Sequence, residues 1–301
     1  MKNKALARYL HPQVIAEVGG FEFNPKGLVE GSQAGAHKSP FHGFSVEFAG
    51  HREYIPGDDP KHIDWVVYYK RERYMIKQYE AETNLVAQIL MDVSESMKFA
   101  SGAISKKDYA CYLATSLIYL VTKARDKAGL AMFDENVTNY IPPSNSLSSV
   151  YKISKILEDV ELRKKTDISR PLMEFASLCG HRQIVILISD FLTDLDRLGE
   201  GLSRLRFNNH EIVLFHVLDN AELTFPLEGR VKFKGLEGYP ELLMTPKQIR
   251  KAYLKKIEEH NARLREICDR NQAEYVLADT SRPVQELLYG YMTSRLTHLN
   301  H

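Results

Sequence analysis

Short apolar runs and amphipathic stretches alternate along most of the chain. Four runs are apolar at nearly every position, which is typical of strands buried on both faces of a parallel sheet. These runs cover residues 85–91, 129–133, 183–189 and 211–218. Apolar residues at helical spacing occupy residues 107–125, 146–160, 170–179, 194–207, 246–270 and 284–295. Strands alternating with helices predict an α/β fold, a doubly wound and mostly parallel sheet flanked by helices on both faces.

Two regions interrupt this alternation. Residues 1–82 are polar and rich in glycine and tyrosine, with short alternating runs at 41–53 and 74–79, so we expect an N-terminal extension that contains β-strands. Residues 83–301 then form the main domain. Within that domain, residues 222–245 carry Gly and Pro punctuation and short alternating runs, which predicts a β-excursion from the main sheet.

Composition narrows the class of protein. The formal net charge of +1 provides no basic footprint for nucleic acid. The three cysteines lie far apart in the sequence, which favours a reducing compartment over a disulfide framework. No apolar stretch approaches the roughly eighteen residues of a membrane span, and the start of the chain lacks a signal-peptide core. We therefore expect a cytoplasmic protein with no nucleic-acid partner and no membrane insertion.

The stretch richest in candidate chemistry follows the first apolar run. Asp92, Ser94 and Ser96 come at alternate positions, and residues two apart point the same way in an extended segment. Open α/β sheets bind their ligands beyond the carboxyl ends of their strands. Carboxylate and hydroxyl oxygens suit hard divalent cations such as Mg²⁺. Two later loops add oxygen donors, Thr166 before a helix and Asp190 after an apolar run.

This set of residues resembles the metal-ion-dependent adhesion site of von Willebrand factor A domains. The resemblance implies a non-enzymatic protein-binding module that holds Mg²⁺ or Mn²⁺, with Ca²⁺ as a third candidate. The implied metal ligands are Asp92, Ser94, Ser96, Thr166 and Asp190. An acidic residue of a partner would complete the metal shell. Phe191 stands where glycine is common in these domains, so this loop is expected to differ.

A second resemblance involves the segment YIPGDDPKHIDW at residues 54–65, followed by IKQYEAE and the Asp-x-Ser-x-Ser strand. It is similar to family fifty-eight of the domains of unknown function, over roughly residues 30–290. Members of that family look like companions of MoxR-type AAA+ ATPases. The resemblance implies a MoxR-type ATPase or its client as the partner that supplies an Asp or Glu, in protein complex assembly or maturation.

Two other interpretations of the Asp-x-Ser-x-Ser stretch stay open. It could be a polar turn whose hydroxyls cap the following helix. The alternative function is a magnesium-dependent hydrolase that uses Asp92, although such enzymes generally need a second nearby carboxylate. Glu95, the nearest acid, is expected to alternate away from the metal side. His216, inside an apolar run, is expected to be a hydrogen-bonded core residue.

Structural roles are expected in the 54–65 segment. Asp59 precedes a proline and should cap a short helical turn. Asp58 and Asp64 should pair with nearby arginine or lysine residues. Trp65, the only tryptophan, is expected in the core.

Overall fold

The structure is a computed structural model, and two compact units make up the chain. It describes residues 8–10, 46–55, 58–81, 85–162, 168–180, 182–227, 231–233, 242–244 and 246–299. The larger unit comprises Met1–Glu30 and Leu85–His301, and the smaller one comprises Gly31–Asn84. Within the described residues, no helix has the length and apolar content needed to cross a membrane.

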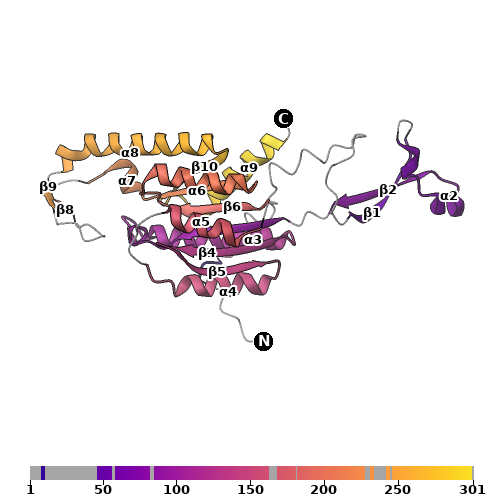
Figure 1. Cartoon of the computed structure of the whole chain (residues 1–301), viewed down its shortest axis with the longest axis horizontal. Coiled ribbons are helices and arrows are strands. Elements are labelled where there is room, and N and C mark those ends of the chain that lie inside the picture. Colours follow the sequence, from indigo (N-terminus) through magenta and orange to yellow (C-terminus); the bar gives the residue numbers. More distant parts are fainter. Residues whose placement is uncertain are drawn as a thin grey trace. The chain divides into compact units, whose positions relative to one another are not determined.

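The larger unit is built on a six-stranded sheet with the strand order β10-β7-β6-β3-β4-β5 (Figure 1). Its strands are β3 (Val86–Asp92), β4 (Lys127–Phe133), β5 (Val137–Ser144), β6 (Ile184–Ser189), β7 (Glu211–Leu218) and β10 (Ala273–Asp279). All neighbours pair in parallel except β5, which runs antiparallel to β4 at one edge. The predicted α/β class with a mostly parallel sheet is confirmed. Because β4 lies on one side of β3 and β6 on the other, the topological switch point falls between β3 and β6.

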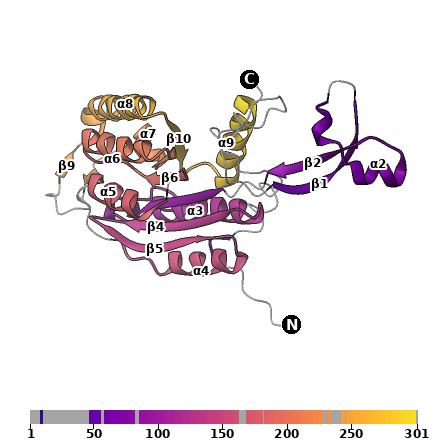
Figure 2. The ribbon, with the colours of Figure 1, turned by 45° about the vertical axis from the view of Figure 1, so that its right-hand side comes forward.

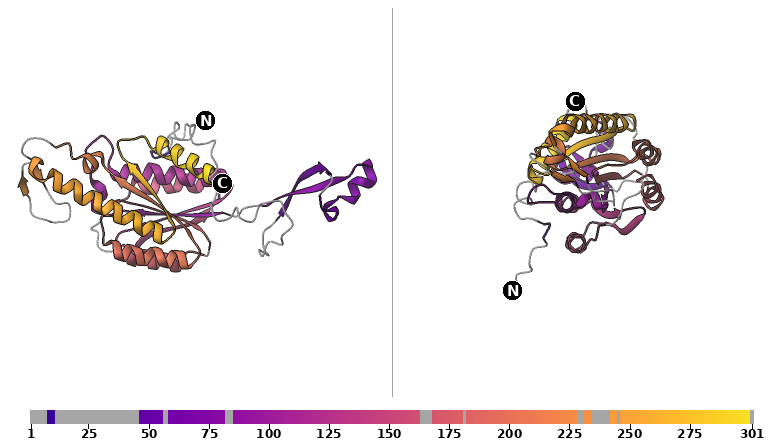
Figure 3. Two further views of the ribbon diagram at one scale, coloured as in Figure 1. Left: turned by 90° about the horizontal axis from the view of Figure 1, so that it is seen from above. Right: turned by 90° about the vertical axis from the view of Figure 1, so that its left-hand side faces the viewer.

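Helices cover both faces of this sheet (Figure 2, Figure 3). One face carries α3 (Lys106–Lys123), α4 (Leu147–Glu158) and α9 (Val284–Leu299). The other carries α5 (Ser169–Leu178), α6 (Leu195–Phe207) and α8 (Pro246–Arg270). The central strand β3 serves both cores, because Ile89 and Met91 join the first cluster and Leu90 joins the second. This explains why its sequence is a continuous apolar run.

The predicted β-excursion at 222–245 contains an antiparallel pair, β8 (Val231–Phe233) with β9 (Leu242–Met244). It is preceded by a short helix that was not predicted, α7 (Asn220–Thr224). Helix α7 begins with a capping box. The Asp219 carboxylate accepts a hydrogen bond from a backbone amide in the first turn, and the Glu222 carboxylate accepts one from the Asp219 amide. This cap fixes Glu222 next to the main sheet.

The N-terminal segment differs from the single extension that was expected. Tyr9 and Leu10 are buried in the core of the larger unit. The Tyr9 hydroxyl donates to the Asp108 carboxylate at 2.7 Å, and its ring meets the Tyr112 ring edge-on. This short piece of chain therefore packs on α3 of the larger unit.

The smaller unit is a hairpin that carries a short helical insertion. In chain order it contains β1 (Val46–Glu53), η2 (Pro60–His62), α2 (Trp65–Arg71) and β2 (Met75–Ala81). Strands β1 and β2 pair antiparallel. Ile63 is buried and forms an isolated bridge with Ile76, while the Asp64 amide donates to the Met75 carbonyl at 2.8 Å. These contacts hold the insertion against β2.

The expectation that Trp65 lies in a core is wrong. The side chain opens α2 on its outward side and is 58% exposed. The physical reason is the size of the unit, because a two-stranded hairpin with one short helix can cover only one face of that helix.

Candidate metal centre

Asp92 ends β3 at the switch point and is almost fully buried. Its Oδ1 accepts a hydrogen bond from the Ser94 amide at 2.8 Å. Its Oδ2 accepts one from the Ser189 hydroxyl at 2.5 Å. Since Ser189 is the last residue of β6, the Asp92 carboxylate joins the ends of two neighbouring strands and is held in one orientation.

The hydroxyls of Ser94 and Ser96 lie 2.9 Å apart, and Ser94 is fully buried. Ser94 precedes the 3-10 helix η3 (Glu95–Lys98), but its side chain makes no capping hydrogen bond there. The interpretation of this stretch as a polar turn requires the Ser94 hydroxyl to cap the following helix, and that hydrogen bond is not formed. Adjacent oxygens on an octahedral Mg²⁺ stand about 3 Å apart, because each lies about 2.1 Å from the metal at right angles. The hydroxyl pair fits that spacing.

Asp190 follows β6 directly and is fully buried, and both of its carboxylate oxygens have protein donors. Oδ1 accepts from the Leu192 amide at 3.2 Å, and Oδ2 accepts from the Lys106 ammonium at 2.9 Å. In this arrangement Asp190 would influence a cation through a water molecule or through its charge rather than by direct contact. Phe191 has a φ of 46°, in the left-handed region that favours glycine. Phe191 therefore holds a backbone conformation that glycine adopts more easily.

Lys106 is a charged group of this region that the sequence pattern did not single out. It opens α3, is fully buried, and donates to Asp190 and to Glu222 Oε1 at 2.8 Å. Burial alone would lower the pKa of Lys106, but the two carboxylates outweigh it and the pKa is raised. The ammonium group therefore stays charged. A signal was present in the sequence, because Lys106 lies three residues before Tyr109 on the apolar stripe of the helix.

His216 supports the Asp190 loop from within the sheet, as expected of a hydrogen-bonded core residue. Its Nε2 lies 2.9 Å from the Asp190 carbonyl, and its Nδ1 lies 2.9 Å from the Tyr275 hydroxyl. Because a carbonyl oxygen only accepts, Nε2 carries the proton and Nδ1 accepts from the tyrosine. Burial lowers the pKa of His216 to about 3, so the ring is neutral.

The remaining predicted residues have different outcomes. Thr166 lies outside the described residues. Glu95 forms an ion pair with Lys98 at 3.0 Å. Among the described residues, no three or more His, Cys, Asp and Glu side chains gather in a metal-binding arrangement. The candidate centre therefore depends on hydroxyl oxygens together with one carboxylate, Asp92.

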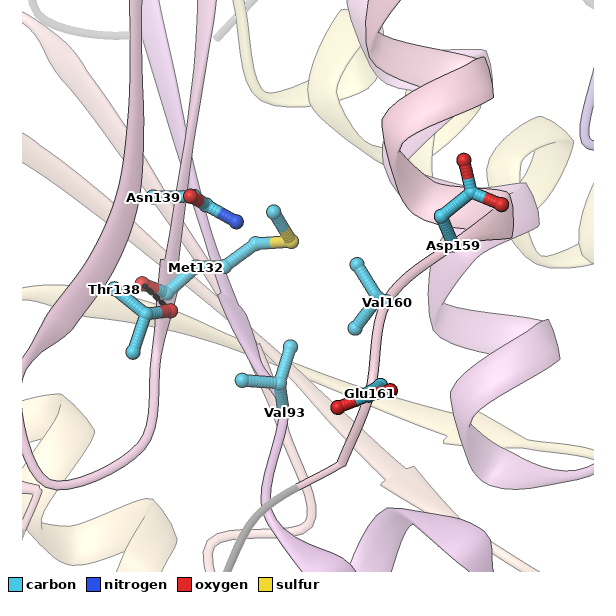
Figure 4. A pocket seen from close by; sticks show the side chains of 7 residues that line it. All are labelled: Val93, Met132, Thr138, Asn139, Asp159, Val160 and Glu161. Carbon is cyan, nitrogen blue, oxygen red and sulfur yellow. Dashed lines mark hydrogen bonds between the residues drawn. The ribbon is translucent and has the colours of Figure 1, made fainter.

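A hollow of about 180 Å³ lies next to the candidate centre (Figure 4). It is lined by Val93, Met132, Thr138, Asn139, Asp159, Val160 and Glu161. Val93 stands between Asp92 and Ser94, and Figure 4 shows its side chain facing Met132 and Val160. The lining is mixed, with apolar side chains from Val93, Met132 and Val160 and polar or acidic ones from the other four residues.

The carboxylates of the 54–65 segment belong to the smaller unit and have structural partners. Asp58 accepts two hydrogen bonds from Arg52, both at 2.7 Å, and this pairing lowers the pKa of Asp58 to about 2. Asp59 caps η2, as expected. Asp64 contacts His51 at 2.9 Å, and it also caps α2. These contacts explain the carboxylates of the segment without a ligand.

Comparisons with known proteins find distant relatives. Uncharacterized protein Rv1480 of Mycobacterium tuberculosis (strain ATCC 25618 / H37Rv) is 21% identical over 229 residues, which is 75% of this chain and 72% of that protein. The crystal structure of conserved hypothetical protein BatB from Bacteroides thetaiotaomicron is 16% identical with a TM-score of 0.49, covering 71% of this chain and 99% of that one. The SpRpn10 VWA domain is 13% identical with a TM-score of 0.40, covering 69% and 95%. These likenesses are too distant to say what this chain binds.

The family itself is shown by a more extensive match. The sequence model of the family described as "Protein of unknown function DUF58" matches residues 50–263, which include β2, the Asp-x-Ser-x-Ser loop and most of α8. The strand order, the antiparallel edge strand and the position of Asp92 together make the larger unit von Willebrand factor A-like. Because the match covers well over half of its 301 residues, the chain belongs to the DUF58 family.

Proposed function

We propose that this chain is a non-enzymatic protein-binding module that captures its partner through a divalent cation, Mg²⁺ or Mn²⁺ and as a third candidate Ca²⁺. Asp92, Ser94 and Ser96 hold the cation, and Thr166 and Asp190 complete the set. One observation carries the proposal. The buried Ser94 hydroxyl, which caps no helix, lies 2.9 Å from the Ser96 hydroxyl, next to the carboxylate that ends β3. Hydroxyl and carboxylate oxygens are the donors that these hard cations prefer.

Each side chain has a separate task in this proposal. Asp92 supplies negative charge in an orientation fixed by Ser94 and Ser189. Ser94 and Ser96 supply two neutral oxygens at the spacing of neighbouring ligands. Asp190 acts at longer range, since Lys106 already occupies one of its oxygens. When bound, the cation supplies a Lewis-acidic position that takes an anionic oxygen ligand.

The ligand in that position is an Asp or Glu of a partner protein. The resemblance to DUF58 proteins supports a MoxR-type AAA+ ATPase, or a client of that ATPase, as the partner in protein complex assembly or maturation. This part of the proposal rests on the family resemblance alone and is tested separately from cation binding.

A magnesium-dependent hydrolase that uses Asp92 has less support. Both carboxylate oxygens of Asp92 already accept hydrogen bonds, which weakens it as a nucleophile. Asp190 and Glu222 are both ion-paired with Lys106, so neither is placed as a free general base. We expect no hydrolysis of p-nitrophenyl phosphate with Mg²⁺, and turnover that Asp92→Asn abolishes would favour the hydrolase instead.

Cation binding is tested by titrating Mn²⁺ into the full chain and following bound Mn²⁺ by electron paramagnetic resonance. The double variant Ser94→Ala/Ser96→Ala should lose binding while retaining the fold. A matched control exists in Ser146 and Ser148, whose exposed hydroxyls lie 2.7 Å apart and form no hydrogen bond with a carboxylate of the described residues. Ser146→Ala/Ser148→Ala should bind Mn²⁺ like the wild type. Equal binding by all three proteins would place the cation elsewhere.

Partner binding is tested with a purified MoxR-type ATPase from the same organism, in Mg²⁺ and in chelator. The proposal expects association only with the wild type and only with the metal. Association that persists in chelator would leave the cation site without a role in that contact.

A further inference from the structure

Helix α2, which begins at the last residue of the 54–65 segment, has three large apolar or aromatic side chains on its outward face. Helix α2 has about 3.6 residues per turn, so successive residues lie about 100° apart. One arc of the helix is formed by Trp65, Tyr69, Val66 and Lys70, and all four are exposed. Val67, Tyr68 and Arg71 lie on the opposite side. Val67 and Tyr68 are half-buried there, with the Tyr68 ring stacked on Tyr74 at 4.5 Å, whereas Arg71 is exposed at the C-terminal end of the helix. Figure 2 shows α2 beside the end of the β1–β2 hairpin.

The exposed face carries the residue types that dominate protein interfaces. Trp65 is 58% exposed, Val66 64% and Tyr69 90%. Large rigid aromatics of this kind are enriched at the energetic centres of interfaces, together with arginine. A short helix normally turns its apolar side to the core. Here the cap from Asp64 and the Ile63–Ile76 bridge fix the helix with its aromatics outward.

A basic hollow lies at the end of the same helix. It measures about 370 Å³ and is lined by Glu53, Arg71, Arg73 and Met75. Arg73 contacts Glu53 at 3.3 Å, whereas Arg71 has no ion pair with any described residue. Guanidinium groups bind carboxylates in a two-pronged geometry, and Met75 supplies an apolar wall. The hollow therefore suits a carboxylate on a short side chain.

We propose that an acidic, apolar segment of another protein docks on the outward face of α2 and continues past the C-terminal end of the helix to the Arg71–Arg73 hollow. Apolar side chains of that segment cover Trp65 and Tyr69, and one of its carboxylates reaches Arg71. This surface belongs to the smaller unit and uses no residue of the candidate metal centre. It stands whether or not that centre binds a cation.

Charge and size favour this occupant over two others. In a two-fold contact between copies of the chain, the same patch would face itself, which brings Lys70 and Arg71 of the copies toward each other. A helix that binds a lipid surface needs a longer apolar face than three residues on two turns. An acidic, apolar protein segment can cover the apolar face and also pair with Arg71.

The test uses a displayed library of random sixteen-residue peptides, panned on the immobilised full chain in chelator so that the metal centre cannot contribute. We expect the enriched peptides to combine Asp or Glu with Leu, Ile, Phe or Trp.

A synthetic peptide from the selection should shift the emission of Trp65, the chain's only tryptophan, to shorter wavelength. Trp65→Ala should weaken peptide binding at least about tenfold, as expected for an aromatic at an interface centre. Phe207→Ala is the matched control, since Phe207 is an exposed aromatic of the larger unit.

A charge exchange guards against misfolding of α2 as the cause. Arg71→Glu leaves the aromatic face intact and should weaken the peptide about tenfold, and a peptide with its acidic residue changed to lysine should regain binding to this variant. Selected peptides that are basic, or that bind Trp65→Ala as well as wild type, would overturn the proposal. Two results in the absence of peptide binding would also overturn the proposal. One is binding to phosphatidylglycerol vesicles that requires Trp65, and the other is dimer formation that requires Trp65, measured by analytical ultracentrifugation.

Discussion

Two regions of the molecule differ from the usual pattern, in which charged side chains are exposed and large apolar ones are buried. One is the carboxyl end of the sheet in the larger unit, and the other is the outward face of α2. At the sheet edge, Lys106 and Asp190 are charged and fully buried. On α2, Trp65 and Tyr69 are large and aromatic and lie exposed. Buried charges are rare unless paired, and exposed apolar clusters usually mark contact sites.

The difference lies in whether each departure is compensated inside the chain. Lys106 has two carboxylate partners at hydrogen-bonding distance, so its charge is balanced where it is buried. Trp65 meets only the edge of the Tyr68 ring among the described aromatic residues, and both Trp65 and Tyr69 stay largely exposed. We conclude that the buried charges belong to the fold itself, whereas the exposed aromatics remain available to something outside the chain. Substitutions in the two regions should therefore act on different measurements.

The largest effect is expected for Lys106→Met. Removing the ammonium leaves the buried carboxylate of Asp190 without its counter-charge, and breaking a buried ion pair from one side costs about 3–5 kcal/mol. Urea unfolding of the larger unit, followed by far-ultraviolet circular dichroism, should show a loss of that size.

An exposed lysine provides the comparison. Lys255 pairs with Glu259 in α8 at 3.6 Å and is 75% exposed, so Lys255→Met should change the free energy of unfolding by less than about 0.5 kcal/mol. Similar losses in both variants would mean that burial of Lys106 is not what matters.

A smaller effect is expected from acid, through His216. Its pKa is lowered by burial to about 3, whereas an unfolded chain has a histidine pKa near 6.5. The unfolded state therefore binds a proton first as the pH falls, and stability is lost between about pH 6.5 and pH 3. By pH 5 the loss from this one group is about 2 kcal/mol. Wild type and His216→Gln should converge in their free energies of unfolding as the pH falls from 7 to 5, and parallel curves would contradict the assignment.

A still smaller and local effect is expected for Asp64→Ala. Asp64 accepts hydrogen bonds from the Val66 and Val67 amides and so caps α2. Loss of such a cap costs about 1 kcal/mol. Hydrogen exchange should speed up in residues 65–71 and stay unchanged in β3 and β6. Faster exchange throughout the larger unit would mean that Asp64 supports more than the helix.

The general architecture could be predicted because periodicity reports burial directly. Residues 211–218 are apolar at all positions except Glu211 and His216 and form β7 with those bounds, since a strand between two layers of helices needs apolar residues on both faces. Helix 246–270 was predicted with its observed bounds because it opens on a proline and carries apolar residues at helical spacing. The positions of Asp92 and Asp190 at neighbouring strand ends follow from the same logic.

What could not be predicted depends on tertiary neighbours. Lys106 lies on an apolar stripe, but nothing in its local sequence identifies Asp190 and Glu222 as its partners, because they are distant along the chain. Trp65 was assigned to a core because tryptophan is usually buried, and only the small size of the hairpin unit reverses that expectation. In both cases the missing information is how much structure surrounds the residue, which periodicity alone does not report.

The smallest effect on folding is expected for Trp65→Ala, and it is the most direct test of the contrast between Trp65 and Lys106. Trp65→Ala removes the largest side chain of α2, and in a core position such a change costs about 3–5 kcal/mol. Because Trp65 lies on the outward face, we expect its loss to change the free energy of unfolding by less than about 0.5 kcal/mol. The measurement is chemical unfolding of wild type and variant, followed by circular dichroism because the variant lacks the fluorescent residue. A loss of several kcal/mol would mean that the aromatic face is covered by the chain itself, and the contrast with Lys106 would then disappear.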